Sequence, residues 1–475
     1  MPATIQVSAL LGLLVSSLVG CAPYRRVDLP LDAATLTLTE AGATPVDDRW
    51  WSAFDAPGLD RTIHEALTHN FGVRAAYARL RAAEAAVRRE RAPLIPSVGA
   101  SASSSVGTDD PFGGLQRVPV EVGIGASYEI DLFGRIRAQL RGEAQRREVT
   151  RADARTAALS VSAELAGTWI DLAATREQLA LLDRQIEANE QMAAIVRSRV
   201  LHGVVRQADS LRQDRLVEQT RAEQVGRLED LEVLEHRLAV LLGRPPTEVP
   251  EGYPEPLPTE LPVVPPLPAT GLPSELLRRR PDVLAAEHAL YAADADVAVA
   301  VANLYPRFSL RGDLSNAPAS PEALLTGWVA SLGASLTAPL FEGGRRRAEV
   351  RRVRALLDAQ IADYATVLLA ALREVEDALA RNRRQEQTVE LLARQVALAT
   401  QTADNLQLQY VGGLDVGYLD VLTAQTTAQQ LLRRQISARQ RLLNLRIDLY
   451  RALAGGFDPG TDRGTDPGAT EATDE

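Results

Sequence analysis

The chain carries one pattern of segments twice, and this duplication limits its possible folds more than any other feature. In each half, a stretch that alternates apolar and polar residues leads into a long run without proline, residues 120–244 and then 340–458. A helix from Arg135 to about Val200 would be roughly 100 Å long at a rise of 1.5 Å per residue. That length exceeds the width of a globular domain several times, so the sequence predicts pairs of long helices with strands at one end.

The alternating stretches predict strands with one apolar and one polar face. From Val118 to Leu132 the even positions are apolar, and the same alternation runs from Trp328 to Leu340, with shorter partners at 98–106 and 308–314. The amphipathic helices already have each other as partners, so an apolar face toward lipid and a polar face toward a lumen fits best. About 9–11 residues is the length of a tilted transmembrane strand.

Four strands from one chain are too few for a membrane barrel. An open sheet edge in lipid leaves backbone groups without partners, so the chain must oligomerise, and three copies would supply about 12 strands. In such a barrel four acids would face the lumen, where polar side chains tune ion preference: Glu121, Glu129, Asp131 and Asp313. The alternative for these four residues is a position at solvated strand ends.

The chain divides into six segments. The first half comprises a signal peptide at 1–20, a lipid-anchored extended segment at 21–58, and a first repeat at 59–244 with strands near 97–106 and 118–132 and helices near 135–200 and 206–243. The second half comprises a proline-rich linker at 245–281, a second repeat at 282–455 with strands near 308–315 and 328–340 and helices near 345–411 and 418–454, and a disordered acidic tail at 456–475.

The N-terminus predicts export and lipidation. The apolar run from Val7 to Val19 is too short to span a bilayer and is typical of a secretory signal. Small residues before Cys21, the only cysteine, resemble a bacterial lipoprotein signal, in which that cysteine carries the lipid that holds the protein on a membrane. The residue after it, Ala22, implies the outer membrane by the same resemblance. The alternative is an ordinary cleaved signal with an incidental cysteine.

Composition excludes several functions. A net charge of -10 gives no support for nucleic-acid binding, and a chain without lysine cannot form a P-loop. The five histidines are scattered without metal-binding spacing. We therefore predict neither enzymatic activity nor a metal or other cofactor, apart from the covalent lipid.

Glycines mark the point where each long helix turns back, at Gly203 and at Gly412-Gly413. Acidic and apolar residues follow these turns: Asp209 after the first, and Asp415, Leu419 and Asp420 after the second. Helix N-terminal capping is the alternative role for the three acids, and packing between helices is the alternative role for Leu419.

In order and spacing, a series of short motifs resembles the TolC-type outer membrane factors, and specifically their lipoprotein branch. The motifs extend from about residue 18 to about residue 455: Leu18-Val19-Gly20-Cys21, Trp50-Trp51, Leu94-Ile95-Pro96, Asp131-Leu132-Phe133-Gly134-Arg135, Arg279-Arg280-Pro281-Asp282, Leu304-Tyr305-Pro306, Pro339-Leu340-Phe341-Glu342-Gly343-Gly344 and Tyr418-Leu419-Asp420-Val421-Leu422. The resemblance implies a mainly α fold with a small transmembrane β part. It implies a homotrimer whose 12-stranded β-barrel in the outer membrane of a Gram-negative bacterium continues into a 12-helix periplasmic α-barrel.

The resemblance also implies a function: a passive exit duct for an efflux pump. Its partners would be a periplasmic adaptor, an inner-membrane RND-type transporter and outer-membrane lipid. Side chains near the second helical turn would close the periplasmic tip as a gate, for which Asp420, Asp415, Leu419 and Asp209 are the candidates, although Thr423 stands where a second aspartate is common in the family. The alternatives are a duct for type I protein secretion and a periplasmic coiled-coil lipoprotein with a structural role.

Overall fold

The computed structural model describes residues 49–104, 106–107, 116–117, 121–246, 258–269, 279–316 and 326–453. The elements follow one another in the order η2 (Trp50–Phe54), α2 (Pro57–His69), α3 (Phe71–Arg91), η3 (Ala92–Leu94), β1 (Ser97–Ser103), β2 (Val106–Gly107), β3 (Gln116–Arg117), β4 (Glu121–Ile130), α4 (Arg135–Leu201), α5 (Gln207–Leu241), α7 (Pro281–Ala302), β5 (Arg307–Asn316), β6 (Val329–Thr337), α8 (Arg345–Val411) and α9 (Tyr418–Leu453). The predicted signal peptide, the lipidation site Cys21 and the tail lie outside the described residues.

Two compact units divide the chain, and they cut across the two repeats. The first unit contains Val87–Ala144 and Leu290–Ala362, and so holds the sheet with the parts of the helices nearest to it. Among the described residues, the second unit contains 49–86, 145–289 and 363–453, and so holds most of the long helices. Each repeat therefore contributes its strands to one unit and its helical turn to the other.

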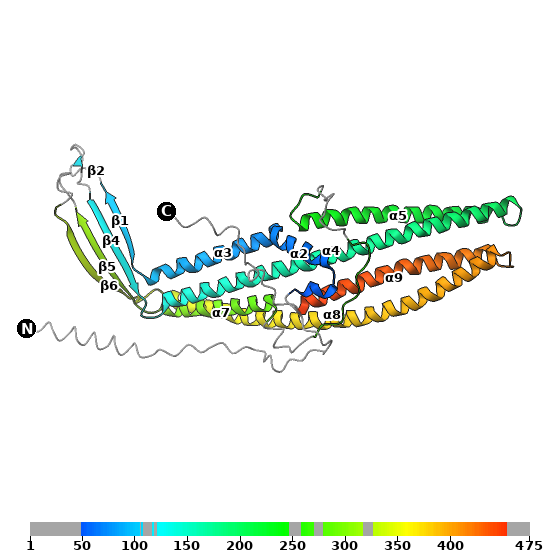
Figure 1. The fold of residues 1–475 in the computed structure, drawn as a ribbon. Helices are drawn as coiled ribbons and strands as arrows, with labels where there is room; N and C mark the ends of the chain where they lie inside the picture. Colours follow the sequence, from blue (N-terminus) through cyan, green and yellow to red (C-terminus); the bar gives the residue numbers. More distant parts are fainter. Residues whose placement is uncertain are drawn as a thin grey trace, which may run out of the picture. The chain divides into compact units, whose positions relative to one another are not determined.

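The first unit is built on a four-stranded antiparallel sheet with the order β1-β4-β5-β6 (Figure 1). The register places Ala126 opposite both Val98 and Gly312, and it places Leu310 opposite Ala334. Because residues directly opposite one another share a face, the even-numbered positions of all four strands lie together. The sheet thus has one largely apolar face and one largely polar face, as the alternation predicts.

Three of the four strands of the sheet, β1, β4 and β6, are shorter than the alternating stretches. β4 covers Glu121–Ile130 within the predicted 118–132, and β6 covers Val329–Thr337 within the predicted 328–340. β1 ends at Ser103, and Val106 and Gly107 pair with Gln116 and Arg117 in a separate two-stranded ribbon. Alternation in the sequence continues past the last ladder hydrogen bond, so it overestimates these three strands by a few residues. β5, at Arg307–Asn316, is instead slightly longer than the predicted 308–315.

The long helices begin and end close to the predicted residues. α4 and α8 each have 67 residues, and each pairs with a shorter helix, α5 of 35 residues and α9 of 36 residues (Figure 1). Of the described helices, α8 alone contains an 18-residue window apolar enough to cross a membrane, and only 22% of that window is buried. Since α8 begins with three arginines and continues for 67 residues, we interpret the window as a packing surface and not as a membrane span.

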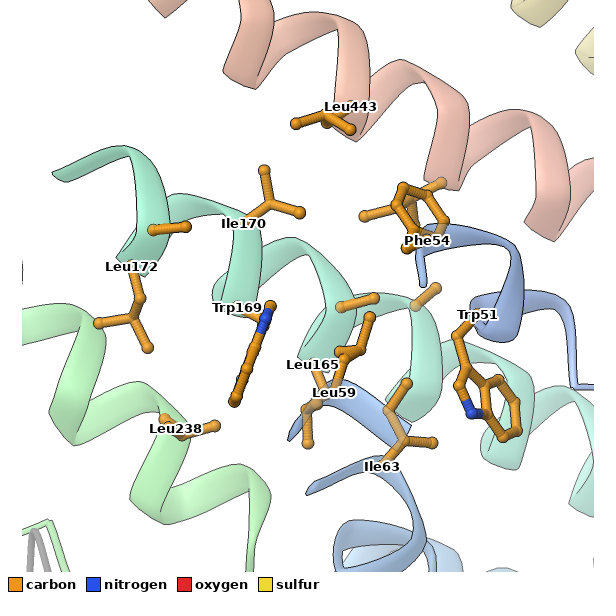
Figure 2. Packing of buried hydrophobic residues seen from close by; sticks show 14 of the residues in the cluster. Trp51, Phe54, Leu59, Ile63, Leu165, Trp169, Ile170, Leu172, Leu238 and Leu443 are labelled. Carbon is orange, nitrogen blue, oxygen red and sulfur yellow. The ribbon is translucent and has the colours of Figure 1, made fainter. Parts of the chain in front are cut away.

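The main core of the second unit lies where the N-terminal elements pack against the long helices. Leu59 and Ile63 of α2 pack with Leu165 and Trp169 of α4, and Leu238 of α5 and Leu443 of α9 belong to the same cluster (Figure 2). Trp50, Trp51 and Phe54 of η2 extend this cluster, and the Trp50 ring stacks on Tyr450 at 6.0 Å. The Trp-Trp motif therefore fastens the segment that follows the predicted lipid anchor to the helices.

Candidate gate and pore-lining residues

The two helical turns have the same backbone geometry. Gly203 has a φ of 70° and Gly413 a φ of 78°, the left-handed conformation that glycine adopts without strain. The residue after each glycine makes the same hydrogen bond back to the helix. Val204 N–H donates to the Arg199 carbonyl at 2.9 Å, and Leu414 N–H donates to the Gln409 carbonyl at 3.0 Å. The glycines that mark the predicted turns thus close both helix pairs with a Schellman motif.

Next to these turns, the two helix pairs pack on each other through a buried apolar cluster. Its members come from all four helices: Met192 and Val196 of α4, Leu216 of α5, Tyr410 of α8, and Tyr418, Val421 and Leu422 of α9. The Arg199 guanidinium lies 4.2 Å from the centre of the Tyr410 ring and donates a 2.7 Å hydrogen bond to the Tyr410 carbonyl. A cation over an aromatic face adds to the apolar packing, so the two turns hold each other.

Asn189 of α4, which is fully buried, joins three helices just behind this cluster. Its side-chain oxygen accepts hydrogen bonds of 2.8 Å from both Gln425 and Gln429 of α9, and its side-chain nitrogen donates to Thr220 of α5 at 3.0 Å. Its carbonyl accepts a 2.9 Å bond from the buried Gln213 of α5. Because unpaired buried amides are costly, such a cluster holds the helices in one register.

Tyr418, the first residue of α9, extends the Asn189 cluster to the turn. Its hydroxyl donates a 2.7 Å hydrogen bond to the side-chain oxygen of Gln213. Burial, together with the neighbouring Tyr410 and the negative charge of Asp209, raises the pKa of Tyr418 well above its ordinary value. The hydroxyl therefore keeps its proton throughout the physiological range.

The gate candidate Asp209 is buried and paired. Its side chain is only 9% exposed, and it forms a 2.9 Å ion pair with Arg212, one helical turn further along α5. It is the third residue of α5, where the helix dipole favours an acid. Its position therefore stabilises the start of α5 and leaves no free carboxylate at the surface of this chain.

The other gate candidates are exposed. Leu419 is 57% exposed, and Asp415 and Asp420 are exposed as well. Within the part of the chain that the structure describes, neither Asp415 nor Asp420 forms an ion pair or a side-chain hydrogen bond. Of the four candidates, these three are the side chains that the protomer leaves exposed.

Two of the four predicted lumen acids are engaged by the start of α4. Asp131 lies one residue past β4, and its carboxylate accepts hydrogen bonds from the backbone N–H groups of Ile136 and Arg137 at 3.1 and 3.0 Å. The strand has ended at this point, and the carboxylate satisfies free N–H groups at a helix start. A lumen-facing position of Asp131 stays a prediction. Glu129 remains on the polar face but accepts two hydrogen bonds from the Arg135 guanidinium, at 2.8 and 3.0 Å, in a bidentate ion pair.

The polar face of the sheet also carries arginines, which the sequence analysis did not predict there. Glu121 and Asp313 lie on this face with Glu129, and so do the exposed Arg307 and Arg311 of β5. These arginines alternate with apolar residues in the same way as the acids, so the rule that found the acids could have found them. The face therefore has mixed charge. Among the described residues, no group of histidine, cysteine or acidic side chains could hold a metal ion.

Comparison with known proteins identifies the family. The family model of outer membrane efflux proteins matches residues 62–244 and 272–455. This chain belongs to the outer membrane efflux protein family. It is 31% identical to the outer membrane protein OprJ of Pseudomonas aeruginosa, covering 96% of each chain, and 30% identical to the pyoverdine export outer membrane protein OpmQ of Pseudomonas putida, covering 93% of this chain and 96% of that protein.

Solved structures of the family have the same fold. The outer-membrane channel OprN superposes with a TM-score of 0.81 at 31% identity, covering 91% of this chain and 98% of that one. The open state of the MtrE outer membrane channel of Neisseria gonorrhoeae superposes with a TM-score of 0.82 at 28% identity, covering 92% and 99%. The chain is thus one protomer of a trimeric outer-membrane channel with a small transmembrane β part and a periplasmic helical barrel.

Family membership gives the observed geometry its direction. An outer membrane efflux protein is the exit duct of a tripartite pump, which rules out the alternative of a structural lipoprotein without a channel. In a transmembrane barrel an apolar face is turned to lipid and a polar face to the lumen, which is what we predict for the two faces of this sheet. The Asn189 cluster and the Tyr410–Tyr418 packing lie next to the two Schellman turns.

Proposed function

We propose that this duct conducts substrates passively and is closed at its periplasmic tip by Leu419, Asp415 and Asp420 of three copies. One observation carries the proposal: the residues around the turns that hold the two helix pairs together are buried, whereas these three are exposed at the same place. Three copies would bring six carboxylates close together at the axis, where they would repel anions and attract cations. Asp209 would support the gate through packing and not line it.

The pump partners that we propose are a periplasmic adaptor and an inner-membrane transporter of the RND type. Relatives of this chain are named for a toluene efflux pump and a solvent efflux pump, both of Pseudomonas putida, and for pyoverdine export. These names cover chemically unlike molecules in proteins of one architecture. We therefore infer that the pump selects the substrate, which here would be a small organic molecule, and that the duct binds no substrate tightly.

We also propose that Cys21 carries the covalent lipid that anchors each copy to the outer membrane. The small residues before Cys21 support this, and so does the Trp50–Tyr450 stack, which fastens the chain a short distance after the anchor. Mass spectrometry of the mature N-terminal peptide tests the proposal. A diacylated or triacylated cysteine at position 21 is expected, and an unmodified N-terminus at any other residue would contradict it.

Planar-bilayer conductance of the purified full chain, after its oligomeric size is checked, tests the gate. A trimer with small conductance that rises severalfold in Asp420→Ala supports the gate, and Glu229→Ala, which removes an exposed acid from α5, serves as the matched control. If the trimer conducts and Asp420→Ala leaves its conductance unchanged, the protein is still a duct but other residues form its gate. A monomer that never conducts would contradict the duct itself.

A further inference from the structure

The ends of the four strands that join the helices carry an unusual amount of positive charge. Four short stretches meet there, residues 87–97, 131–141, 303–307 and 341–354, because the antiparallel order puts the start of β1 and β5 beside the end of β4 and β6. In a chain of net charge -10 they contain four acidic residues and thirteen arginines: Arg88, Arg89, Arg91, Arg135, Arg137, Arg141, Arg307, Arg345, Arg346, Arg347, Arg351, Arg352 and Arg354.

Most of these arginines, here called the arginine belt, are exposed, and many have no acidic partner. All except Arg135 and Arg346 are exposed in the protomer. Six members form ion pairs: Arg89 with Glu90, Arg135 with Glu129, Arg137 with Asp131, Arg345 and Arg346 with Glu342, and Arg352 with Glu349. Among the described residues, seven members form no ion pair: Arg88, Arg91, Arg141, Arg307, Arg347, Arg351 and Arg354.

Local helix stability does not account for the belt on α8. Arg345, Arg346 and Arg347 are the first three residues of this helix, and its first turn contains no acid. Glu342, just before the helix, compensates Arg345 and Arg346. Arg347 has no acidic partner and lies near the positive end of the helix dipole, so its charge is locally unfavourable. Such a conflict between local preference and observed sequence points to a gain from something outside the chain.

An apolar band lies directly on the strand side of the belt. Leu340 is 95% exposed and Phe341 is 90% exposed, both just past β6, while Leu132 and Ile95 are 65% and 67% exposed at the ends of β4 and β1. All four side chains closely follow or precede a strand at the end of the sheet that joins the helices. Apolar and aromatic side chains followed by arginines are the order expected where a membrane core gives way to head groups.

We propose that the arginine belt binds the phosphate groups of anionic phospholipids in the inner leaflet of the outer membrane. The belt lies at the periplasmic end of the sheet, because the helices that follow are periplasmic. A guanidinium donates two parallel hydrogen bonds to phosphate oxygens, and arginine is the side chain best suited to this geometry. The unpaired arginines Arg347, Arg351 and Arg354 lie three and four residues apart, so one side of α8 presents them together.

Binding of these lipids would fix the height and tilt of each copy in the membrane, independently of the lipid on Cys21. This inferred lipid binding rests on the outer-membrane location of the sheet and not on the identity of the gate. The conductance of a belt variant should therefore equal that of the wild-type protein. A wrong gate assignment leaves this inference untouched, and a protein that never conducts marks failure of the duct itself.

The test compares lipid binding to the full-length trimer in neutral detergent micelles doped with phosphatidylglycerol or with phosphatidylcholine. The test variant is Arg347→Gln/Arg351→Gln/Arg354→Gln, and the control Arg184→Gln/Arg383→Gln/Arg434→Gln removes three exposed arginines from the second unit. Native mass spectrometry counts the bound lipids, and thermal unfolding gives the shift in Tm on lipid addition. Because each arginine near an anionic surface contributes about a fivefold preference, the belt variant should lose at least roughly 10-fold in apparent phosphatidylglycerol affinity.

The expected result is preferential binding of phosphatidylglycerol by the wild-type and control proteins, with a rise in Tm that the belt variant lacks. Equal binding of the two lipids by the wild-type protein would overturn the proposal. So would a belt variant that retains full phosphatidylglycerol binding. A belt variant that dissociates into monomers in phosphatidylcholine micelles would also overturn it, because the arginines would then hold neighbouring copies and not lipid.

Discussion

The tips of the two helix pairs have the same backbone geometry but place an aspartate in different environments. Asp209 and Asp420 are each the third residue of a helix that follows a Schellman turn. Asp209 is buried and paired with Arg212, whereas Asp420 is exposed and has Thr423 at the position equivalent to Arg212. One duplicated unit thus supplies a structural tip in the first repeat and a tip with free carboxylates in the second.

This difference shows how a duplicated unit can divide two tasks. The first tip, with Arg199 over Tyr410 and Gln213 bonded to Tyr418, holds the second tip in place. The second tip can then leave its polar side chains unsatisfied by its own chain, which is what a gate around an axis requires. If the proposed gate is right, stability and gating are located on different members of an otherwise equivalent pair.

The largest expected effect comes from breaking the connection between the two pairs. Asn189→Leu would leave Gln425, Gln429 and Thr220 without their partner and should lower the free energy of unfolding by roughly 2–4 kcal/mol. Conductance should rise, since the pairs lose their fixed register. Thermal unfolding and bilayer conductance measure these two effects.

The matched control for that variant is Asn405→Leu, which changes an exposed asparagine of α8 in the same chemical way. Its Tm and conductance should stay at the values of the wild-type protein. If Asn189→Leu and Asn405→Leu have the same Tm, the buried amides do not fix the register, and the contrast between the two tips rests on the turns alone.

A smaller effect should separate the two acids themselves. Asp209→Ala removes a buried, paired carboxylate from the first turn of α5 and should cost about 1–2 kcal/mol of stability. Asp420→Ala should leave the Tm unchanged, because the chain gives that carboxylate no partner to lose. Denaturant unfolding of the two variants side by side measures the difference. Equal losses of stability would remove the distinction between a structural and a gating acid.

The sequence predicts the long helices and their turns, but not what joins them. Proline-free runs and the glycines at 203 and 413 set the helix ends, and strict alternation identifies the sheet. In the sequence, Asn189 and Gln213 resemble solvated residues in helices already rich in polar side chains. Their burial becomes apparent only from hydrogen bonds to residues 24 or more positions away in the sequence. At Asp131 the alternation extends past the residue at which β4 ends, so the pattern did not reveal that this carboxylate binds the start of α4.

Alkaline pH should weaken the contact between the tips through Tyr418. Its pKa is raised by burial, so below pH of about 10 the hydroxyl is protonated in both the folded and unfolded states and its hydrogen bond to Gln213 is intact. Above that pH the unfolded state loses the proton more readily than the folded state, so stability falls as pH rises. Tyr418→Phe should have a flatter stability profile between pH 9 and about 11 than the wild-type protein. Parallel profiles for the two proteins would exclude this role for the hydroxyl.

The smallest and most selective change would convert the second tip into a copy of the first. Thr423→Arg places an arginine three residues after Asp420, the spacing that pairs Asp209 with Arg212 at 2.9 Å. The new guanidinium should neutralise the Asp420 carboxylate. Conductance should therefore change in the same direction as in Asp420→Ala, by about twofold. This change should be smaller at high salt, because salt screens an exposed ion pair. Thr423→Gln, which has no charge, is the control. If the two substitutions change conductance equally, the size of the side chain at position 423 matters and the pairing of the acid does not.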